Sequence, residues 1–398
     1  SGCADTGFWL FILLLLLFLL LLFMDVYIFG GCEKMLKETS EYLLAKGNDV
    51  DLLLIYKSEN NTYLKMLDPR IKIKYIWDID SRSYLAKRMV YWINVLFPKI
   101  ASAHVDINEY DMIINFKDDY QTNIISSKFK CKKISWVHNI TEEYSGIDKK
   151  GIKYRLAELV YKKVDKKYIN TFSRFDTVVF VSEHAKDALE KKLLKTINSM
   201  VIYNYVNVPL ISELAEEAVA DYSFNKFTFC YVGRLSAEKG VMEIVEAFCR
   251  LVQNGCDANL IVLGEGYQLE ELKRLAVEKK CQSNICFLGT KENPYPYIKK
   301  SDVILCASYK ESFGLVVLES IILNKWIIST KCGGPEELIE DGVNGYLVGD
   351  YQKLYEKMKE LYKKQDMRVK KSSILDYKNL KSIFGEKMNL LINDKEGC

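Results

Sequence analysis

The sequence predicts an α/β protein built from two Rossmann-like domains. Short apolar runs of strand length alternate with longer segments of helical periodicity, as in parallel α/β folds. The chain has 398 residues, and two domains of roughly 150–200 residues each are the usual arrangement at that length. The alternation stops over Asn204–Phe224 and restarts at Lys226, so we place the linker between the domains in that stretch.

Composition excludes several classes of protein. A hydrophobic content of 49% is enough for packed cores, and a net charge of only +3 argues against a dedicated nucleic-acid binder. The eleven cysteines are scattered and form no Cys-x-x-Cys pair, which predicts buried free thiols in a reducing compartment rather than a disulfide frame or a zinc site. Only three histidines occur, none closely spaced, so we expect no catalytic metal.

The N-terminus carries an uninterrupted apolar run of 17 residues, Phe8–Met24, and no Lys or Arg precedes Lys34. A membrane-spanning helix needs about 20 residues, with roughly 17 as the lower limit. The run could be a membrane anchor, or its last part, Leu19–Met24, could be the first strand of the sheet. We favour the strand, because a glycine pair follows where a βα loop is required, and treat residues 1–18 as an apolar leader or anchor.

The first domain, residues 19–204, continues with an amphipathic helix over Cys32–Lys46 that ends at Gly47. The preceding pair Gly30-Gly31 either cradles an anion or hydroxyl at the helix N-terminus, or serves only the geometry of a tight turn. Further elements are expected as a helix at Tyr84–Phe97 and strands at Val50–Ile55, Tyr75–Ile79, Met112–Phe116, Ile134–Val137, Thr177–Val181 and Val201–Tyr203.

His138 directly follows the predicted strand at Ile134–Val137, so it should lie at the carboxyl end of that strand, where α/β proteins bind ligands. A lone histidine is more often a satisfied structural residue. Position alone therefore leaves its role open, and His104 and His184 carry no functional prediction.

The segment Lys149–Lys167 is strongly basic and has helical periodicity. Four lysines share one face of that helix: Lys162, Lys163, Lys166 and Lys167. Such a helix can lie on an anionic membrane surface. An ordinary solvated helix face explains the same pattern equally well.

In the second half, strand Phe227–Val232 leads into a glycine and two cations, Gly233, Arg234 and Lys239. Cations beside a helix N-terminus suit a diphosphate. Another strand, Leu260–Leu263, ends at Gly264. The remaining elements are expected as a strand at Ile285–Leu288 and helices at Val241–Val252, Leu269–Lys279, Tyr351–Lys364 and Asn379–Asn393.

Two carboxylates frame the next strand–loop–helix unit. The strand is expected at Val303–Ala307 and is followed by a polar loop that contains Glu311. The helix starts at Gly314 and carries Glu319, roughly 7–8 Å along its axis. Carboxylates placed in this way can hold two hydroxyl-rich parts of one ligand. A further strand, Trp326–Thr330, leads into a Gly-Gly-Pro-Glu sequence.

These motifs together resemble one family. The pair Glu311-x7-Glu319, the stretch CGGPE that begins at Cys332 and the stretch VGRLSAEKG that ends at Gly240 resemble family-4 retaining glycosyltransferases. The resemblance implies the GT-B fold, with two Rossmann-like domains facing across a cleft. It assigns nucleotide-sugar binding to residues 205–375 and a helix that crosses back to the first domain to residues 376–398.

The resemblance also assigns roles to residues. Glu319 would hold the ribose hydroxyls and Glu311 the donor sugar, while His138 would face that sugar from the acceptor half. The residues expected to be catalytic are Glu311, His138, Arg234 and Lys239. The residues expected to bind the donor are Gly30, Gly31, Gly233, Arg234, Lys239, Gly264, Glu311, Ser312, Phe313, Gly314, Leu315 and Glu319.

The function implied is metal-independent, retaining transfer from a nucleotide sugar, UDP-linked by expectation, to a lipid-linked or polysaccharide acceptor in bacterial surface glycan synthesis. No cofactor and no nucleic acid are expected. The location expected is the cytoplasm, with attachment to the inner face of the membrane left open. Two alternatives stay open: a nucleotide-sugar epimerase and a non-catalytic sugar-binding subunit. A nicotinamide dehydrogenase is disfavoured, because the first glycine pair lacks the Gly-x-Gly-x-x-Gly pattern.

Overall fold

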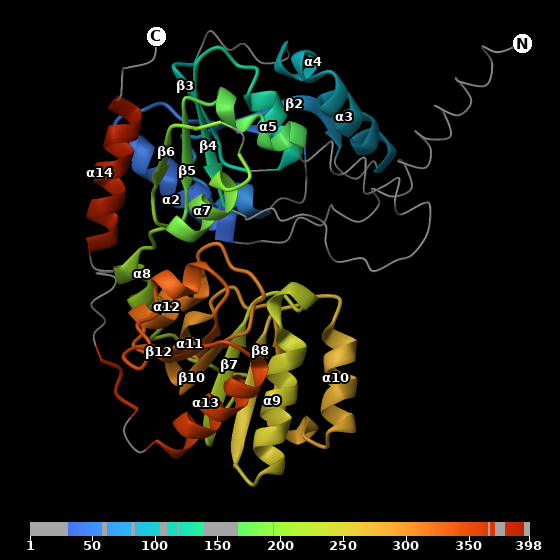
Figure 1. Ribbon diagram of the computed structural model, residues 1–398, viewed down its shortest axis with the longest axis vertical. Helices are drawn as coiled ribbons and strands as arrows, with labels where there is room; N and C mark the ends of the chain where they lie inside the picture. Colours follow the sequence, from blue (N-terminus) through green and yellow to red (C-terminus); the bar gives the residue numbers. More distant parts are fainter. Residues whose placement is uncertain are drawn as a thin grey trace, which may run out of the picture. The chain divides into compact units, whose positions relative to one another are not determined.

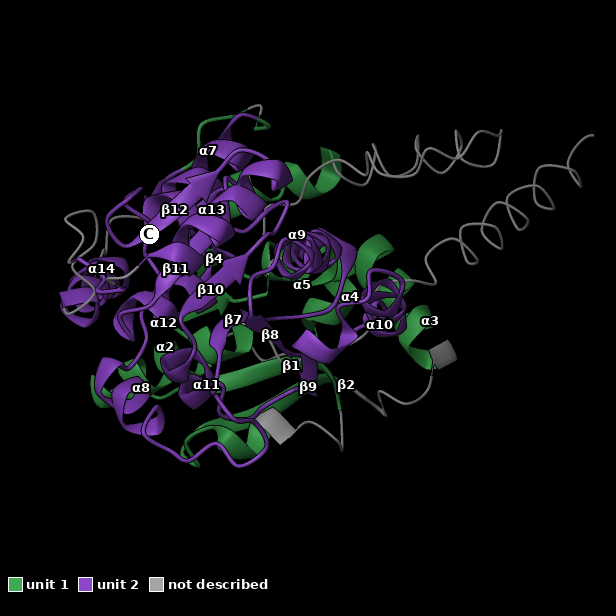
Figure 2. Ribbon diagram, turned by 90° about the horizontal axis from the view of Figure 1, so that it is seen from below, with its two compact units in different colours: residues 1–135, 141–176, 192–197 green, residues 136–140, 177–191, 198–398 purple. Residues whose placement is uncertain are grey.

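The computed structural model describes residues 31–57, 62–80, 84–103, 110–117, 119–138, 166–193, 195–364, 367–370 and 379–393. The predictions on Gly30, on Leu19–Met24 and on Lys162 and Lys163 lie outside these residues. The chain divides into two compact units (Figure 2): unit 1 comprises residues 1–135, 141–176 and 192–197, and unit 2 comprises residues 136–140, 177–191 and 198–398.

Unit 2 contains a parallel six-stranded sheet with the order β12-β11-β10-β7-β8-β9. This half therefore has parallel α/β architecture, and the prediction for it is confirmed. The strands are β7 (Phe227–Val232), β8 (Ala258–Leu263), β9 (Ile285–Gly289), β10 (Val303–Cys306), β11 (Trp326–Thr330) and β12 (Gly345–Val348). Strand β12 was not predicted from the sequence.

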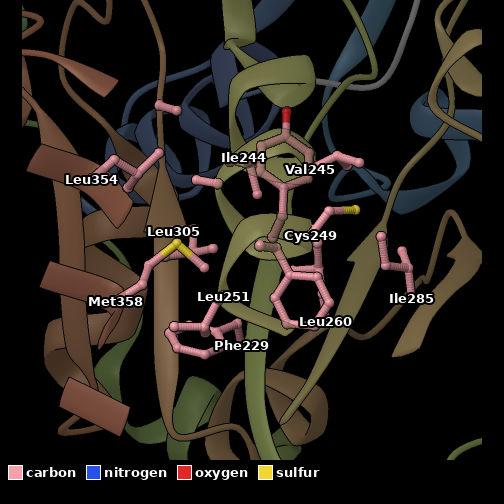
Figure 3. Close-up of a cluster of buried hydrophobic side chains, with 14 of the residues drawn as sticks. Phe229, Ile244, Val245, Cys249, Leu251, Leu260, Ile285, Leu305, Leu354 and Met358 are labelled. Atoms are coloured by element: carbon pink, nitrogen blue, oxygen red, sulfur yellow. The ribbon is translucent and has the colours of Figure 1, made fainter. Parts of the chain in front are cut away.

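Side chains on alternate residues of these strands point to opposite faces, and both faces are buried. Phe229, Leu260 and Leu305 pack into one hydrophobic core with Val245 of α9 (Val241–Gln253) and Met358 of α13 (Tyr351–Lys363). Figure 3 shows this cluster, in which strand and helix side chains meet. The neighbouring residues on three of the strands are equally inaccessible on the other face: Cys230, Ile261 and Ile304. Burial on both faces explains why these strands are continuous apolar runs.

Helices cover the sheet as their periodicity predicts. In Figure 1, α9 lies beside α10 (Leu269–Glu278), and both contribute buried residues to the same core as α13. Further helices are α11 (Tyr295–Lys300), α12 (Leu315–Ile322) and α14 (Leu380–Asn393). The predicted linker is not irregular throughout, because it contains α8 (Val208–Leu214), which begins at an Asn207 cap.

One cysteine prediction was wrong. Cys249 on α9 and Cys281, which follows α10, form a disulfide with Cα atoms 5.4 Å apart. The two positions are 32 residues apart in sequence, and only the packing of α9 against α10 brings them within bonding range. Seven other cysteines among the described residues take part in no disulfide.

The first half of the chain forms two sheets among the described residues. A parallel pair contains β1 (Asp51–Lys57) and β2 (Lys72–Asp80), and a four-stranded sheet has the order β3-β4-β5-β6. The latter strands are β3 (Met112–Asn115), β4 (Lys132–Val137), β5 (Thr177–Phe180) and β6 (Ser199–Val201). The predicted strand at Leu19–Met24 lies outside the described residues. That strand stays a prediction.

Among the described residues, the helices of this half include α2 (Gly31–Ala45), α3 (Tyr84–Leu96), α4 (Pro98–Ala103), α5 (Tyr120–Ser126) and α7 (Glu183–Glu190). Within unit 2, the terminal helix α14 packs its buried Phe384 against Trp136 of β4 and against Tyr205, with ring centroids 6.2 Å and 5.0 Å apart. Lys387 on α14 donates a hydrogen bond to the carbonyl of Val201. The last helix therefore contacts residues of the first half. No helix among the described residues is long and apolar enough to cross a bilayer.

Candidate active site

The donor-side residues gather where the strand order of unit 2 reverses. The loops after β7 and β10, which are neighbours in the sheet but not in the chain, carry Gly233, Arg234 and Lys239 on one side and Glu311 on the other. Ligands of open α/β sheets bind outside the carboxyl ends of the strands at such a switch point. The topology thus brings together four of the residues that the sequence analysis singled out.

Lys239 and Glu311 form a direct ion pair across this point, with Nζ and Oε2 2.6 Å apart. Their side chains are 22% and 24% exposed, so both charges are partly shielded from water. Burial alone would lower the pKa of Lys239, but the adjacent Glu311 carboxylate outweighs it and raises the pKa above 10.5. Lys239 is therefore a permanent cation at the mouth of the strands, held in place by a carboxylate.

Arg234 supplies a second cation with a looser partner. Its guanidinium lies 3.8 Å from Glu238, and both side chains are 51% exposed, a separation and exposure at which an ion pair contributes little. The backbone at Arg234 is fixed instead, because the buried Tyr231 hydroxyl donates to its carbonyl oxygen at 2.7 Å. The guanidinium thus keeps freedom to engage an anionic ligand on a rigid backbone.

The loops after β7 and β8 touch through glycines. Gly264 has φ +139°, and a Cβ at that position would lie 1.9 Å from the carbonyl oxygen of Gly233. The amide of Gly233 in turn donates to the carbonyl of Leu263 at 2.9 Å. No residue other than glycine fits this approach without moving the backbone that carries Arg234. The packing requirement accounts for Gly264 independently of any ligand.

The backbone around Glu311 is pinned to the loop after β11. Its amide donates to the carbonyl of Cys332 at 2.8 Å, and its own carbonyl accepts from the amide of Gly334 at 2.7 Å. The hydroxyl of Ser308 lies 3.4 Å from the carboxylate. The Gly-Gly-Pro-Glu sequence therefore acts through its backbone, by holding Glu311 toward Lys239.

The residues after Glu311 serve the loop and the start of α12. The carbonyl of Ser312 accepts from the Ser182 hydroxyl at 2.6 Å, and Phe313 is buried with its ring centroid 5.9 Å from that of Tyr203. Gly314, at φ +90°, is the cap from which α12 begins at Leu315. In this structure the contacts of Ser312 and Phe313 are structural, and their predicted role in donor binding stays a prediction.

Glu319 lies on α12, away from bulk solvent. It is only 5% exposed, and its Oε1 accepts a hydrogen bond from the Tyr295 hydroxyl of α11 at 3.3 Å. A buried carboxylate beside a hydroxyl donor has acceptor capacity for further hydroxyls. This is the chemistry that the predicted contact to a ribose requires.

The glycine pair of the first domain is only partly described. Gly31 is the first residue of α2, as expected for a βα loop that ends there, while Gly30 lies outside the described residues. This does not distinguish a ligand cradle from a simple tight turn, so both interpretations of the glycine pair stay predictions.

His138 follows β4 and stacks on Trp136, with ring centroids 6.1 Å apart and an interplanar angle of 7°. It is 8% exposed, and burial lowers its pKa from 6.5 to about 3. The imidazole is therefore neutral at physiological pH. A neutral ring suits a hydrogen-bonding contact to a sugar, and that contact stays a prediction.

The low pKa of His138 predicts a pH-dependent stability. Between pH 6.5 and about pH 3, His138 is protonated in the unfolded chain but neutral in the folded chain. The free energy of unfolding therefore falls as pH falls through this window. The His138→Phe variant keeps an aromatic ring for stacking but has no group that titrates here. Between pH 7 and pH 5 we expect its free energy of unfolding to fall by about 2 kcal/mol less than that of the parent chain. Urea unfolding at both pH values measures this, and a difference between the chains that does not change with pH would contradict it.

Glu337 is a residue that the sequence analysis missed. Its carboxylate accepts hydrogen bonds from the amides of Glu183 and His184 at the start of α7, at 3.0 and 2.7 Å, and from the Tyr203 hydroxyl at 2.8 Å. Burial and this carboxylate raise the pKa of Tyr203. The only signal in sequence was the acidic doublet that ends the stretch after β11, whose partners lie more than 130 residues earlier.

Comparison with known proteins gives these motifs a family. Residues 216–373 match the family model described as glycosyl transferases group 1. The chain carries a group 1 glycosyl transferase domain. It includes the switch point of the sheet, the ion pair of Lys239 with Glu311, and Glu319, so the family resemblance of the sequence is confirmed for this half.

Two curated relatives extend beyond that domain. An uncharacterized glycosyltransferase, MJ1059 of Methanocaldococcus jannaschii, is 26% identical over 69% of this chain and 73% of its own length. A poly(glycerol-phosphate) alpha-glucosyltransferase of Bacillus subtilis is 22% identical over 76% of this chain. The aligned region spans 44% of the length of the latter protein.

The fold is shared with a solved structure that holds UDP and glucose. The chain matches Anabaena Alr3699/HepE, solved in complex with UDP and glucose, with a TM-score of 0.69 over 91% of this chain and 96% of that one, at 18% identity. The expected GT-B class is therefore confirmed. Among the described residues, no group of three or more His, Cys, Asp or Glu side chains gathers in a way that could hold a metal ion.

Proposed function

We propose that this glycosyltransferase moves a sugar from a UDP-sugar to a lipid-linked or polysaccharide acceptor, with retention of anomeric configuration and without a metal ion. The observation that carries the proposal is the fixed cation Lys239, 2.6 Å from Glu311, with Arg234 beside it at the switch point of the sheet. The choice of UDP is supported by the shared fold with HepE, whose structure holds UDP and glucose.

The chemistry requires positive charge at this place. When a nucleotide sugar breaks down, negative charge grows on the departing diphosphate, and groups that are already oriented toward that charge lower the barrier most. Lys239 meets this condition because Glu311 and the backbone hold it. Arg234 meets it because its guanidinium can bond two phosphate oxygens at once. These two side chains would stabilise the charge on the departing diphosphate, as a divalent cation does in many other transferases. Metal independence is therefore part of the proposal.

Glu311 would take a second role once the donor binds. Its carboxylate lies next to the cation that contacts the phosphate, which is where the donor sugar must be, and it can accept hydrogen bonds from sugar hydroxyls. For retention, the acceptor oxygen would attack from the side of the departing phosphate, and that phosphate would take up the acceptor proton. Such a route needs no separate general base, and the neutral imidazole of His138 would only orient the sugar.

The acceptor is proposed from a relative rather than from the site. The Bacillus subtilis relative is a poly(glycerol-phosphate) alpha-glucosyltransferase, a name that implies a polymeric acceptor. A polymeric or lipid-linked acceptor is consistent with that, and the inner face of the membrane is the place where such acceptors and a nucleotide sugar would meet.

The proposal is tested by donor binding and hydrolysis with EDTA present. We expect one member of a panel of UDP-, GDP- and ADP-sugars, a UDP-sugar, to bind and to be hydrolysed slowly, with no change on adding Mg²⁺ or Mn²⁺. A strict requirement for metal would overturn metal independence. Binding to no donor by the folded protein, with residues 1–18 both kept and removed, would favour the non-catalytic alternative. Release of an isomerised nucleotide sugar would favour the epimerase.

A further inference from the structure

A pocket of about 690 Å³ opens on unit 1 and shares no lining residue with the donor side. It is formed by the end of α3, by α4, by α5 with the turn after it, and by residues 166–174. The three helices pack against one another, and α3 and α4 are adjacent in Figure 1. The lining residues are mainly cationic or apolar, and they carry no acidic side chain.

Five cations line this pocket: Lys99, Lys128, Lys166, Lys167 and Arg174. Among the described residues none of them is in an ion pair with a carboxylate. Lys167 donates one hydrogen bond, to the carbonyl of Val95 at 3.2 Å. Burial and the neighbouring charges of Arg174, Lys99 and Lys167 lower the pKa of Lys128. In a chain whose net charge is only +3, this is a strong local excess of positive charge.

Apolar side chains border the same pocket and point into solvent. Leu96, Phe97 and Ile100 are 52%, 59% and 47% exposed. Met89, which is 58% exposed, lies seven residues before Leu96 on α3, so the two share one face of the helix. The rim thus continues along α3 as an apolar strip beside the cations.

We propose that this surface docks the protein on an anionic lipid bilayer. Cations without acidic partners attract anionic headgroups. Exposed leucine and phenylalanine side chains are stabilised when they leave water for an apolar phase. A soluble phosphate would satisfy the cations and leave the apolar rim in water. A bilayer interface offers anionic headgroups to the cations and acyl chains to the apolar rim. Long lysine side chains can reach the headgroups while the apolar residues lie deeper.

The docking surface is related to the predicted basic helix but is not the same. Lys166 and Lys167 belong to both, whereas Lys162 and Lys163 lie outside the described residues. The structure adds Lys99, Lys128 and Arg174, which come from other parts of the sequence, and it adds the apolar rim. The proposal does not depend on the transfer reaction.

The test is sedimentation of the full chain with vesicles of phosphatidylcholine alone or with about 30% phosphatidylglycerol, an anionic lipid. We expect binding to the anionic vesicles that weakens as salt rises, because exposed charges are screened. The triple variant Lys99→Gln, Lys128→Gln, Arg174→Gln should bind roughly 100-fold more weakly, since each nearby cation contributes roughly a fivefold gain in affinity. The double variant Phe97→Ala, Ile100→Ala should also bind more weakly, and it should lose the part of the binding that persists at high salt.

A matched control removes three exposed cations from unit 2 instead, by Lys273→Gln, Arg274→Gln and Lys353→Gln. It should bind anionic vesicles as the parent chain does. If this control lost as much vesicle binding as the triple variant of the pocket, the effect would be one of net charge alone, and this result would overturn the proposal. So would equal binding of the parent chain to neutral and anionic vesicles, which would point to the apolar N-terminal run that all variants retain. Affinity for UDP should be the same in every variant, which separates failure of docking from failure of the transferase.

Discussion

Replacing Lys239 by alanine is expected to lower the rate of sugar transfer by about 100- to 1,000-fold, the usual effect of removing one preorganised group that stabilises developing charge. Two physical effects combine. The departing diphosphate loses a fixed cation. In the parent chain the carboxylate of Glu311 lies 2.6 Å from the Lys239 ammonium; in the variant this carboxylate has lost that partner and repels the phosphate. Steady-state kinetics with the donor identified by the binding panel measure the change, which should fall mainly on kcat.

Lys353→Ala is the matched control for this prediction. Lys353 is an exposed lysine in the first turn of α13, and its removal should leave kcat unchanged. Turnover of Lys239→Ala within about threefold of the parent chain would remove Lys239 from the phosphate site. The alternatives for that site would then be Arg234 and the backbone amides after β7.

The substitution Gly264→Ala is expected to destabilise the fold by about 3 kcal/mol or more and to abolish tight donor binding. The added methyl would lie 1.9 Å from the carbonyl oxygen of Gly233, so the loops after β7 and β8 would have to separate. The backbone at φ +139° adds strain of about 1–3 kcal/mol. Urea unfolding and UDP binding report the two effects independently.

Gly255→Ala separates strain from steric overlap. Gly255 also has a positive φ, +82°, but a Cβ there would meet nothing within 4 Å. It should therefore cost about 1–2 kcal/mol through backbone strain alone and leave UDP affinity intact. Equal effects at Gly264 and Gly255 would show that the contact between the two loops does not position the site.

Much of the second half followed from sequence because its signals are local. The strands of unit 2 are apolar on both faces, so their runs are continuous, and the glycines at their ends are required by the backbone itself. Helix α9 begins and ends within one residue of the prediction. For the same reason the sequence alone predicted that Arg234, Lys239 and Glu311 lie between a strand end and a helix start, and that Glu319 lies on the helix that follows.

Tertiary structure decided whatever depends on distant partners. The pairing of Lys239 with Glu311 joins loops 72 residues apart, and the capping of α7 by Glu337 joins positions 153 and 154 residues apart. The disulfide of Cys249 with Cys281 exists because α9 packs on α10. Sequence periodicity reports which face of an element is buried, but it carries no information on which other element covers that face. The site's residue types were therefore determined by the sequence, while their contacts, charges and the basic pocket of unit 1 were determined only by the fold.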